Sequence, residues 1–158
     1  MTTDFQGLRW KRIDLHFHTP GSGDDYRGQG ATPESIISKA KEIGLDAFAV
    51  TDHNTGAWVD KLKTAAQGSG VVVFPGVEIT VMGGERNVHI LAIFDPSKGM
   101  IHIHDFLAQI GITEDKRGRK DALATGDVNQ VINKITEADG VALLAHCDST
   151  SGVTKEMK

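Results

Sequence analysis

The sequence predicts an α/β fold around a mainly parallel sheet. Two observations support this prediction. Short apolar runs of strand length alternate with segments of helical periodicity. Five of these runs also have a histidine, aspartate or glutamate at or beside one end; they cover residues 12–18, 48–53, 71–78, 88–94 and 141–146. Because the strand ends of a parallel β/α barrel meet at one face, these side chains can form one site.

The first predicted strand covers residues 11–18, where apolar and polar residues alternate. Successive side chains of a strand point to opposite faces, so His16 and His18 point the same way, one pleat apart. Two imidazoles in this arrangement can reach one metal ion. The glycine-rich segment 19–31 that follows is expected to be a loop.

The remaining elements follow from capping signals and apolar periodicity. Thr32 as N-cap and Pro33 at the first helical position begin a helix, and Gly44 ends it. The other predicted elements are a strand ending at residue 53, a helix over 57–66, strands over 71–78 and 88–94, a short helix near 106–110, a helix over 128–135 and a strand over 141–145. Five strands are too few to close a barrel of the usual size. The sheet is therefore either open or, as we expect, the first part of a longer domain.

The composition fits one globular domain. The chain has 158 residues, of which 39% are hydrophobic and 24% are charged. A net charge of -4 gives no general attraction to nucleic acid or to an anionic membrane. One basic cluster fits a solvated loop better than a contact to a phosphate backbone; it consists of Lys116, Arg117, Arg119 and Lys120.

Two further features limit the class of protein. Cys147 is the only cysteine, which excludes an intramolecular disulfide and a cysteine-based zinc site and fits the reducing cytoplasm. No segment approaches ~20 continuous apolar residues, so we expect no membrane-spanning helix. The N-terminus lacks the pattern of a secretory signal peptide. We therefore expect a cytoplasmic protein without a membrane partner.

An ordered set of short motifs resembles the PHP family, named after polymerase and histidinol phosphatase. The matching segments are Asp14-Leu15-His16-Phe17-His18-Thr19, Thr51-Asp52-His53, Pro75-Gly76-Val77-Glu78-Ile79, His89-Ile90-Leu91 and Ala145-His146. Each motif alone is weak, but their order and spacing from about Arg12 to Asp148 are specific. The resemblance implies a distorted (β/α)7 barrel, truncated here after about five strands. It also implies a metal-dependent phosphoesterase that acts on phosphate esters or, as a nuclease, on nucleic acid.

The resemblance further implies two or three divalent ions, Zn²⁺, Mn²⁺ or Fe²⁺, at the strand ends. His16, His18 and Glu78 would share one ion. Glu78 would bridge to a second ion held by His89 and His146. Two such ions neutralise a phosphate ester, generate hydroxide at neutral pH and stabilise the leaving oxygen. A carboxylate can bridge two ions with its two oxygens, unlike an imidazole, and in this set only Glu78 is placed to do so.

A third ion would lie near His53 and an acidic residue of the first loop. The family often has a histidine in that loop, whereas this chain has Asp24 and Asp25, and a carboxylate is an acceptable ligand. We assign Asp24 to the ligand set; Asp25 as the ligand, or a simple turn role for both, are the alternatives. Glu78, His53 and Asp52 are the candidate catalytic residues. Asp52 is expected to orient a ligand rather than to bind metal.

The family's last motif, an Asp-x-His near the end of the domain, has no counterpart after Asp148. We therefore expect the domain, assigned to residues 1–158, to continue in a longer protein. The segments 7–11 and 87–94 also resemble PHP domains that precede large ATPases with coiled-coil arms. That looser similarity implies a C-terminal ATPase domain as a partner, in DNA repair or phage defence.

Several alternatives stay open. His89 lies at the start of its apolar run, so an exposed strand residue is the alternative to a ligand. His102 and His104 form a second His-x-His, but no strand precedes it, and we expect surface residues there. An amidohydrolase-like barrel that cleaves C–N bonds also begins with His-x-His. The missing last motif keeps a third function open, that of a non-catalytic metal-binding scaffold.

Overall fold

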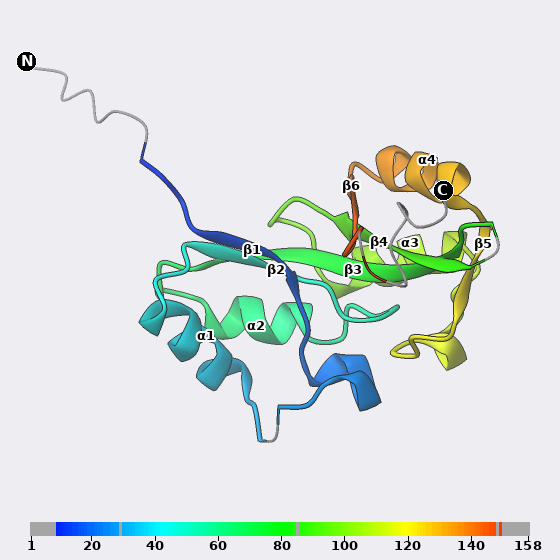
Figure 1. Ribbon diagram of the computed structural model, residues 1–158. Coiled ribbons are helices and arrows are strands. Elements are labelled where there is room, and N and C mark those ends of the chain that lie inside the picture. Colours follow the sequence, from blue (N-terminus) through cyan, green and yellow to red (C-terminus); the bar gives the residue numbers. More distant parts are fainter. Residues whose placement is uncertain (1–8, 29, 85, 148, 150–158) are drawn as a thin grey trace, which may run out of the picture.

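The computed structural model describes residues 9–28, 30–84, 86–147 and 149, apart from the side chain of Asp24. The strands in this part of the chain are β1 (Ile13–Phe17), β2 (Ala47–Val50), β3 (Val72–Met82), β4 (Asn87–Ile93), β5 (Leu123–Asp127) and β6 (Val141–Leu144). The α-helices are α1 (Pro33–Glu42), α2 (Val59–Ala65), α3 (Met100–Gln109) and α4 (Val128–Glu137), and the 3-10 helices are η1 (Pro20–Asp25) and η2 (Glu114–Lys116). The predicted α/β class is confirmed (Figure 1).

The strands form one six-stranded sheet in the order β1-β2-β3-β4-β6, and β5 pairs with β3 off this path. Three of the five pairings are parallel, those of β1 with β2, β2 with β3 and β3 with β5. Parallel pairing is thus in the majority, as predicted. β4 is antiparallel to both of its neighbours, so β6 runs in the same direction as β3. The sequence does not predict this reversal.

β3 is the central strand because it pairs with β2, β4 and β5. Its residues 75–81 are all buried. A Cβ atom on Gly76 would lie 2.9 Å from the carbonyl oxygen of Val50 and 3.0 Å from that of Ala92. Only glycine allows the neighbouring backbones to approach this closely. Glu78 follows two residues later on the same face of β3. Because β3 is the central strand, Glu78 lies in the middle of the sheet.

Capped helices flank the sheet. α1 and α2 pack side by side below β1 and β2 in the view of Figure 1. α1 begins as predicted: the side chain of Thr32 accepts a hydrogen bond from the Ser35 N–H, with Pro33 at the first helical position. α4 begins with an equivalent cap, in which Asp127 accepts from the Gln130 N–H. These caps satisfy backbone donors that the first turn of each helix leaves unpaired.

Several elements differ from the sequence prediction. The segment 19–31, expected to be a loop, contains η1, and β3 continues to Met82, beyond the predicted end at residue 78. β5 is not predicted, because only its first two residues, Leu123 and Ala124, are apolar. It forms by pairing with the last part of β3, beyond the point where β2 has ended. α3 begins at Met100, earlier than predicted, so His102 and His104 both lie on a helix.

Apolar side chains are exposed at both edges of the sheet. Ile13 and Leu15 on β1 are 47% and 41% exposed, and Val141 and Leu144 on β6 are 61% and 43% exposed. β1 and β6 are the two ends of the main strand order. The described part of the chain therefore forms an open, curled half of a barrel.

Two sequence predictions fall partly outside the described residues. They are the similarity over residues 7–11 and the extent of the domain over 1–158. None of the helices in the described part of the chain has the length and apolar character needed to cross a membrane.

Candidate metal centre

Histidines from the parallel side of the sheet converge on Glu78. His16 and His18 lie at the end of β1, and His53 lies just after β2. His53 and Glu78 continue the parallel pairing between β2 and β3, and the Asn54 N–H donates to the Glu78 carbonyl oxygen at 2.9 Å. Because these strands run parallel, their carboxyl ends lie at the same edge of the sheet.

His89 and His146 reach the same place from the antiparallel side. β4 runs antiparallel to β3, so the start of β4 lies beside the end of β3. His89, the third residue of β4, therefore lies near Glu78, although in the sequence it comes at the start of an apolar run rather than at its end. β6 runs in the direction of β3, and His146 follows its end; the Ala145 N–H donates to the His89 carbonyl oxygen at 3.1 Å. Strand direction thus explains the position of His89.

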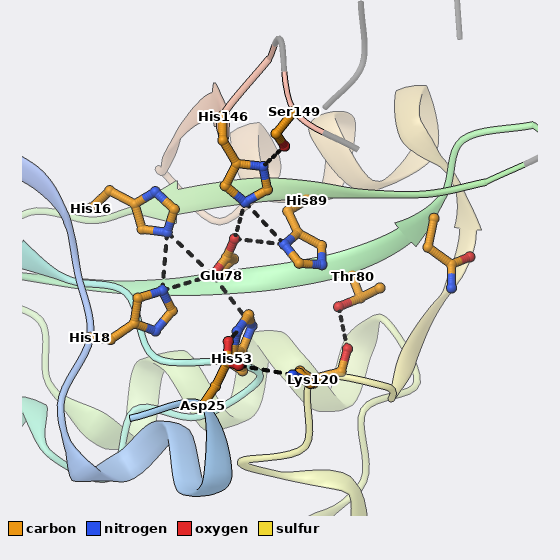
Figure 2. A pocket seen from close by; sticks show the side chains of 11 residues that line it. His16, His18, Asp25, His53, Glu78, Thr80, His89, Lys120, His146 and Ser149 are labelled. Atoms are coloured by element: carbon orange, nitrogen blue, oxygen red, sulfur yellow. Dashed lines mark hydrogen bonds and ion pairs between the residues drawn. The ribbon is translucent and has the colours of Figure 1, made fainter. Parts of the chain in front are cut away.

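The Glu78 carboxylate lies at the centre of the cluster and is 1% exposed (Figure 2). Its Oε1 atom lies 2.8 Å from His89 Nδ1 and 3.1 Å from His146 Nε2. The two imidazole nitrogens lie 3.3 Å from each other. The Oε1 side therefore brings together three potential ligand atoms, from β3, β4 and the end of β6.

The second carboxylate oxygen of Glu78 faces the histidines of the parallel side. Oε2 lies 3.1 Å from His18 Nε2 and 3.3 Å from His16 Nε2 and from His53 Nδ1. Glu78 Oε2 and His53 Nδ1 are buried and make no hydrogen bond. Buried polar atoms without a hydrogen bond need an explanation, and a carboxylate oxygen among imidazole nitrogens is a ligand set for a divalent cation. The residues present therefore fit a metal centre.

The protonation states of Glu78 and His53 suit a cation. Burial by itself raises the pKa of Glu78. The surrounding imidazoles, those of His16, His18 and His89, outweigh burial and hold that pKa well below its usual range, so the carboxylate is ionised. Burial lowers the pKa of His53 and outweighs the neighbouring carboxylates, so its imidazole favours the neutral form. Ionised carboxylates and neutral imidazoles are the forms that bind metal.

Asp25, at the end of η1, supplies a carboxylate beside His53. Its Oδ2 atom lies 2.9 Å from His53 Nε2, and its Oδ1 atom lies 2.8 Å from Lys120 Nζ. The Lys120 ammonium and, after it, His53 lower the pKa of Asp25 to about 2. The side chain of Asp24, the residue assigned to the ligand set, lies outside the described part of the chain. Asp25 is therefore the first-loop carboxylate that the structure places at His53.

A buried hydrogen-bond chain behind His18 fixes the orientation of its ring. Ser22 Oγ donates to Asp52 Oδ1 at 2.7 Å and lies 2.7 Å from His18 Nδ1. Because the hydroxyl gives its one proton to Asp52, it accepts the proton on His18 Nδ1, which leaves the Nε2 lone pair facing Glu78. Asp52 also accepts from the Thr19 N–H, and burial raises the pKa of its carboxyl group. Asp52 lies behind the cluster and does not line the cavity.

The second His-x-His lies elsewhere. The His102 ring packs edge-on against Phe94, with ring centroids 4.7 Å apart. His104 Nε2 accepts a hydrogen bond from the Gly56 N–H at 3.3 Å. Both histidines are half-buried on α3, rather than on the surface as predicted, and neither lines the cavity at Glu78.

The cluster opens into a cavity of about 720 Å³. Besides the cluster itself, the lining comprises Thr80, Asn87, Lys120 and Ser149, none of which is a candidate from the sequence. Thr80 does have a sequence signal, because it follows Glu78 by two residues and so shares its strand face. Lys120 belongs to the basic cluster for which the sequence favours a solvated loop, and Asn87 begins the segment 87–94. No pattern in the sequence points to Ser149.

Comparison with known protein families shows to which family the chain belongs. A model of the PHP domain matches residues 14–150. The chain belongs to the PHP domain family. The resemblance inferred from the five motifs is thereby confirmed, whereas the looser similarity to domains that precede ATPases stays a prediction.

The chain is similar to several curated proteins over part of their length. It is 29% identical over 137 residues to a 5'-3' exoribonuclease of Haemophilus influenzae, a match that covers 76% of this chain and 48% of the relative. It is 34% identical over 88 residues to a 3',5'-nucleoside bisphosphate phosphatase of Chromobacterium violaceum, covering 54% of this chain and 29% of the relative. The chain therefore spans about half or less of the length of these relatives.

Solved structures share the fold of this PHP domain. An amidohydrolase from Chromobacterium violaceum, solved with bound sulfate and no metal, has a TM-score of 0.64 and 20% identity, covering 92% of this chain and 70% of that chain. A proposed metal-dependent phosphoesterase from Bifidobacterium adolescentis has a TM-score of 0.61 and 21% identity. The match covers 87% of this chain and 67% of that chain. At these identities the likeness establishes the fold alone, a partial PHP-type barrel.

Proposed function

We propose that this PHP domain is a metal-dependent phosphoesterase that hydrolyses phosphate esters at a multinuclear site. The shared carboxylate is the observation that supports this most directly, because Oε1 and Oε2 of Glu78 face separate sets of imidazole nitrogens. The similar curated proteins are named as an exoribonuclease and a nucleoside bisphosphate phosphatase. Nucleic acids and nucleotides are therefore the favoured substrates.

The chain's own residues define where the chemistry takes place. Divalent ions on the two sides of Glu78 would neutralise the phosphate and supply a water with a lowered pKa. His16 and His18 hold one side of the carboxylate, and His89 and His146 hold the other. Imidazole and carboxylate without cysteine suit Zn²⁺, Mn²⁺ or Fe²⁺.

We assign a third cation position to His53 and Asp25, in place of Asp24. The His53 ring lies between two carboxylates: Nε2 faces Asp25 Oδ2 and Nδ1 faces Glu78 Oε2. We therefore assign Glu78 and His53 to the reacting phosphate as catalytic residues. Asp52 acts as a positioning residue through Ser22, which holds the His18 ring.

The test is hydrolysis of p-nitrophenyl phosphate and bis(p-nitrophenyl) phosphate by the purified protein, with and without Mn²⁺. We expect metal-dependent turnover that His16→Ala abolishes. His102→Ala is the matched control, because His102 packs against Phe94 away from the cavity. Equal loss of turnover in the two variants would contradict the assignment of the site.

Two alternatives give different results in the same experiment. A non-catalytic scaffold would hydrolyse neither ester, whether or not it binds metal. An amidohydrolase-like enzyme would hydrolyse a cyclic amide instead. A C-terminal ATPase domain and a cytoplasmic location stay predictions.

A further inference from the structure

The segment over residues 51–56, which contains His53, is buried throughout and attached to two neighbouring elements. The Asn54 N–H donates to the Glu78 carbonyl oxygen at 2.9 Å, which attaches the segment to β3. The Asn54 side chain donates to two carbonyl oxygens of the loop between η2 and β5, at 2.8 and 3.0 Å. The place of His53 therefore depends on contacts that the residues after it make.

Helix α3 makes a third contact with this segment, through His104. The His104 Nε2 atom accepts a hydrogen bond from the Gly56 N–H at 3.3 Å. A Cβ atom on Gly56 would lie 3.0 Å from the Cβ atom of Ile103, so the helix packs directly against the backbone of the segment. Gly56 is buried, so His104 satisfies a backbone donor that would otherwise lack a partner away from water.

This hydrogen bond requires a neutral imidazole. A ring nitrogen accepts an N–H only through its lone pair, which Nε2 has when the proton of the ring is on Nδ1. Burial and, after it, the Arg117 guanidinium lower the pKa of His104 below its ordinary value of 6.5. The neighbouring carboxylates act in the opposite direction without outweighing these causes; they belong to Asp105, Glu114 and Asp60. The ring is therefore neutral at pH 7, whereas a protonated ring would direct an N–H toward another N–H.

We propose that His104 is a positioning residue for His53: its neutral ring holds the segment that contains His53 against α3, and protonation of the ring releases that segment. The inference rests on the proposed function, in which His53 belongs to the metal centre. It gives a role to one residue of the second His-x-His, which acts behind the cavity without contacting a cation. Because histidine ordinarily titrates between about pH 5 and 8, the contact makes the cation position at His53 depend on pH through a residue that is not a ligand.

NMR titration of the metal-free protein between about pH 5 and 8 tests the contact without turnover. We expect the Gly56 amide signal to shift with the same midpoint as the His104 imidazole, and the protection of this amide against hydrogen exchange to fall as the ring is protonated. His104→Gln places an amide oxygen where Nε2 lies but does not titrate, so its Gly56 signal should stay constant. A Gly56 signal that follows His53 instead of His104, or that still changes with pH in His104→Gln, would overturn the proposal.

The effect on His53 is measured at pH 7 in two ways. The His53 imidazole signals of the metal-free protein should shift in His104→Ala and return to their wild-type positions in His104→Gln. The affinity of the His53 position for Mn²⁺ should fall about tenfold in His104→Ala, the lower end of the loss caused by removing groups that orient metal ligands, and recover in His104→Gln. His102→Ala, on the same helix and packed against Phe94, is the matched control.

The outcomes separate the positioning role from the proposed hydrolysis. Unchanged His53 signals in His104→Ala would overturn the positioning role, and so would an equal change in His102→Ala, because general damage to α3 would then explain both. If His104→Ala does not fold, the wild-type titration and His104→Gln still decide. A protein that binds no Mn²⁺ and hydrolyses no ester, but whose Gly56 and His53 signals respond to His104 as expected, would refute the proposed function alone.

Discussion

The two halves of the sheet differ in where along their strands the histidines lie. In the parallel half, made of β1 and β2 with α1 and α2, His16, His18 and His53 lie at or just after the carboxyl ends of strands. The antiparallel half is made of β4 and β6 with α4. Here His89 lies near the start of β4, and His146 follows the end of β6. An edge of the sheet, rather than the end of each strand, therefore defines the site.

β3 belongs to both halves and joins them. Its Glu78 directs Oε2 to the histidines of the parallel half and Oε1 to those of the antiparallel half. If each half holds its own cation, then changes in one half should leave the other half intact, and a change at Glu78 should affect both.

Glu78→Gln should have the largest effect, because it removes the charge that both halves share. Loss of groups that merely orient metal ligands costs about 10–100-fold in affinity, so we expect the affinity for divalent metal to fall by more than about 100-fold. Competition with a fluorescent chelator measures the change. His102→Ala is the control, and retention of the full metal content in Glu78→Gln would contradict the bridging role.

His18→Ala and His89→Ala should separate the halves. Each variant is expected to lose about one equivalent of metal and to keep the metal of the other half, because His18 faces Oε2 and His89 faces Oε1. Elemental analysis of the purified variants gives the stoichiometry. Loss of all metal from one variant and none from the other would show that the halves do not act separately.

Ser22→Ala should weaken only the parallel half. Ser22 holds the His18 ring through Nδ1 and is itself held by Asp52, so its removal should lower the metal affinity of that half about 10–100-fold. Ser97→Ala, at a loop position after β4, is the control. A wild-type affinity in Ser22→Ala would mean that the ring is oriented by other contacts.

The smallest effect concerns the order in which two histidines titrate. In the metal-free protein burial lowers the pKa of His18, but the neighbouring carboxylates, first of all Glu78, outweigh it and raise that pKa above 6.5; for His53 burial prevails and the pKa is lowered. Stability due to His18 is present below pH 6.5 and is lost as pH rises through its folded pKa. Stability linked to His53 falls as pH drops below 6.5, because the unfolded chain binds that proton first.

These two contributions to the free energy of unfolding therefore have opposite signs between pH 6 and 7. NMR titration of the imidazole signals measures each residue directly. We expect His18 to titrate at a higher pH than His53. The reverse order would show that the burial of the two rings differs from that described.

The parallel half could be predicted from the sequence and the antiparallel half only in part. Alternation along β1 places His16 and His18 on one face, and parallel pairing then fixes the edge at which they lie. The apolar run of β4 indicates a strand but not its direction, so the place of His89 depends on a reversal that the pattern does not encode. β5 cannot be predicted from the pattern because Leu123 and Ala124 are its only apolar residues.

The supporting residues could not be predicted because long-range contacts place them. Lys120 is held at the site by hydrogen bonds from Asn54 and Thr80 to its loop, across 40 or more positions of sequence. Ser22 lies in a glycine-rich loop, where its contact with Asp52, 30 residues away, has no local signal. Patterns in sequence report which face of an element is apolar, whereas these contacts depend on how elements meet.

Anomalous diffraction from crystals grown with Mn²⁺ would test most directly whether one carboxylate joins two separate cation sites. We expect two strong peaks on either side of the Glu78 carboxylate, one within reach of His16 and His18 and the other within reach of His89 and His146. A peak beside His102 and His104, a single peak bound by one half, or no peak near Glu78 would contradict a metal centre assembled from both halves of the sheet.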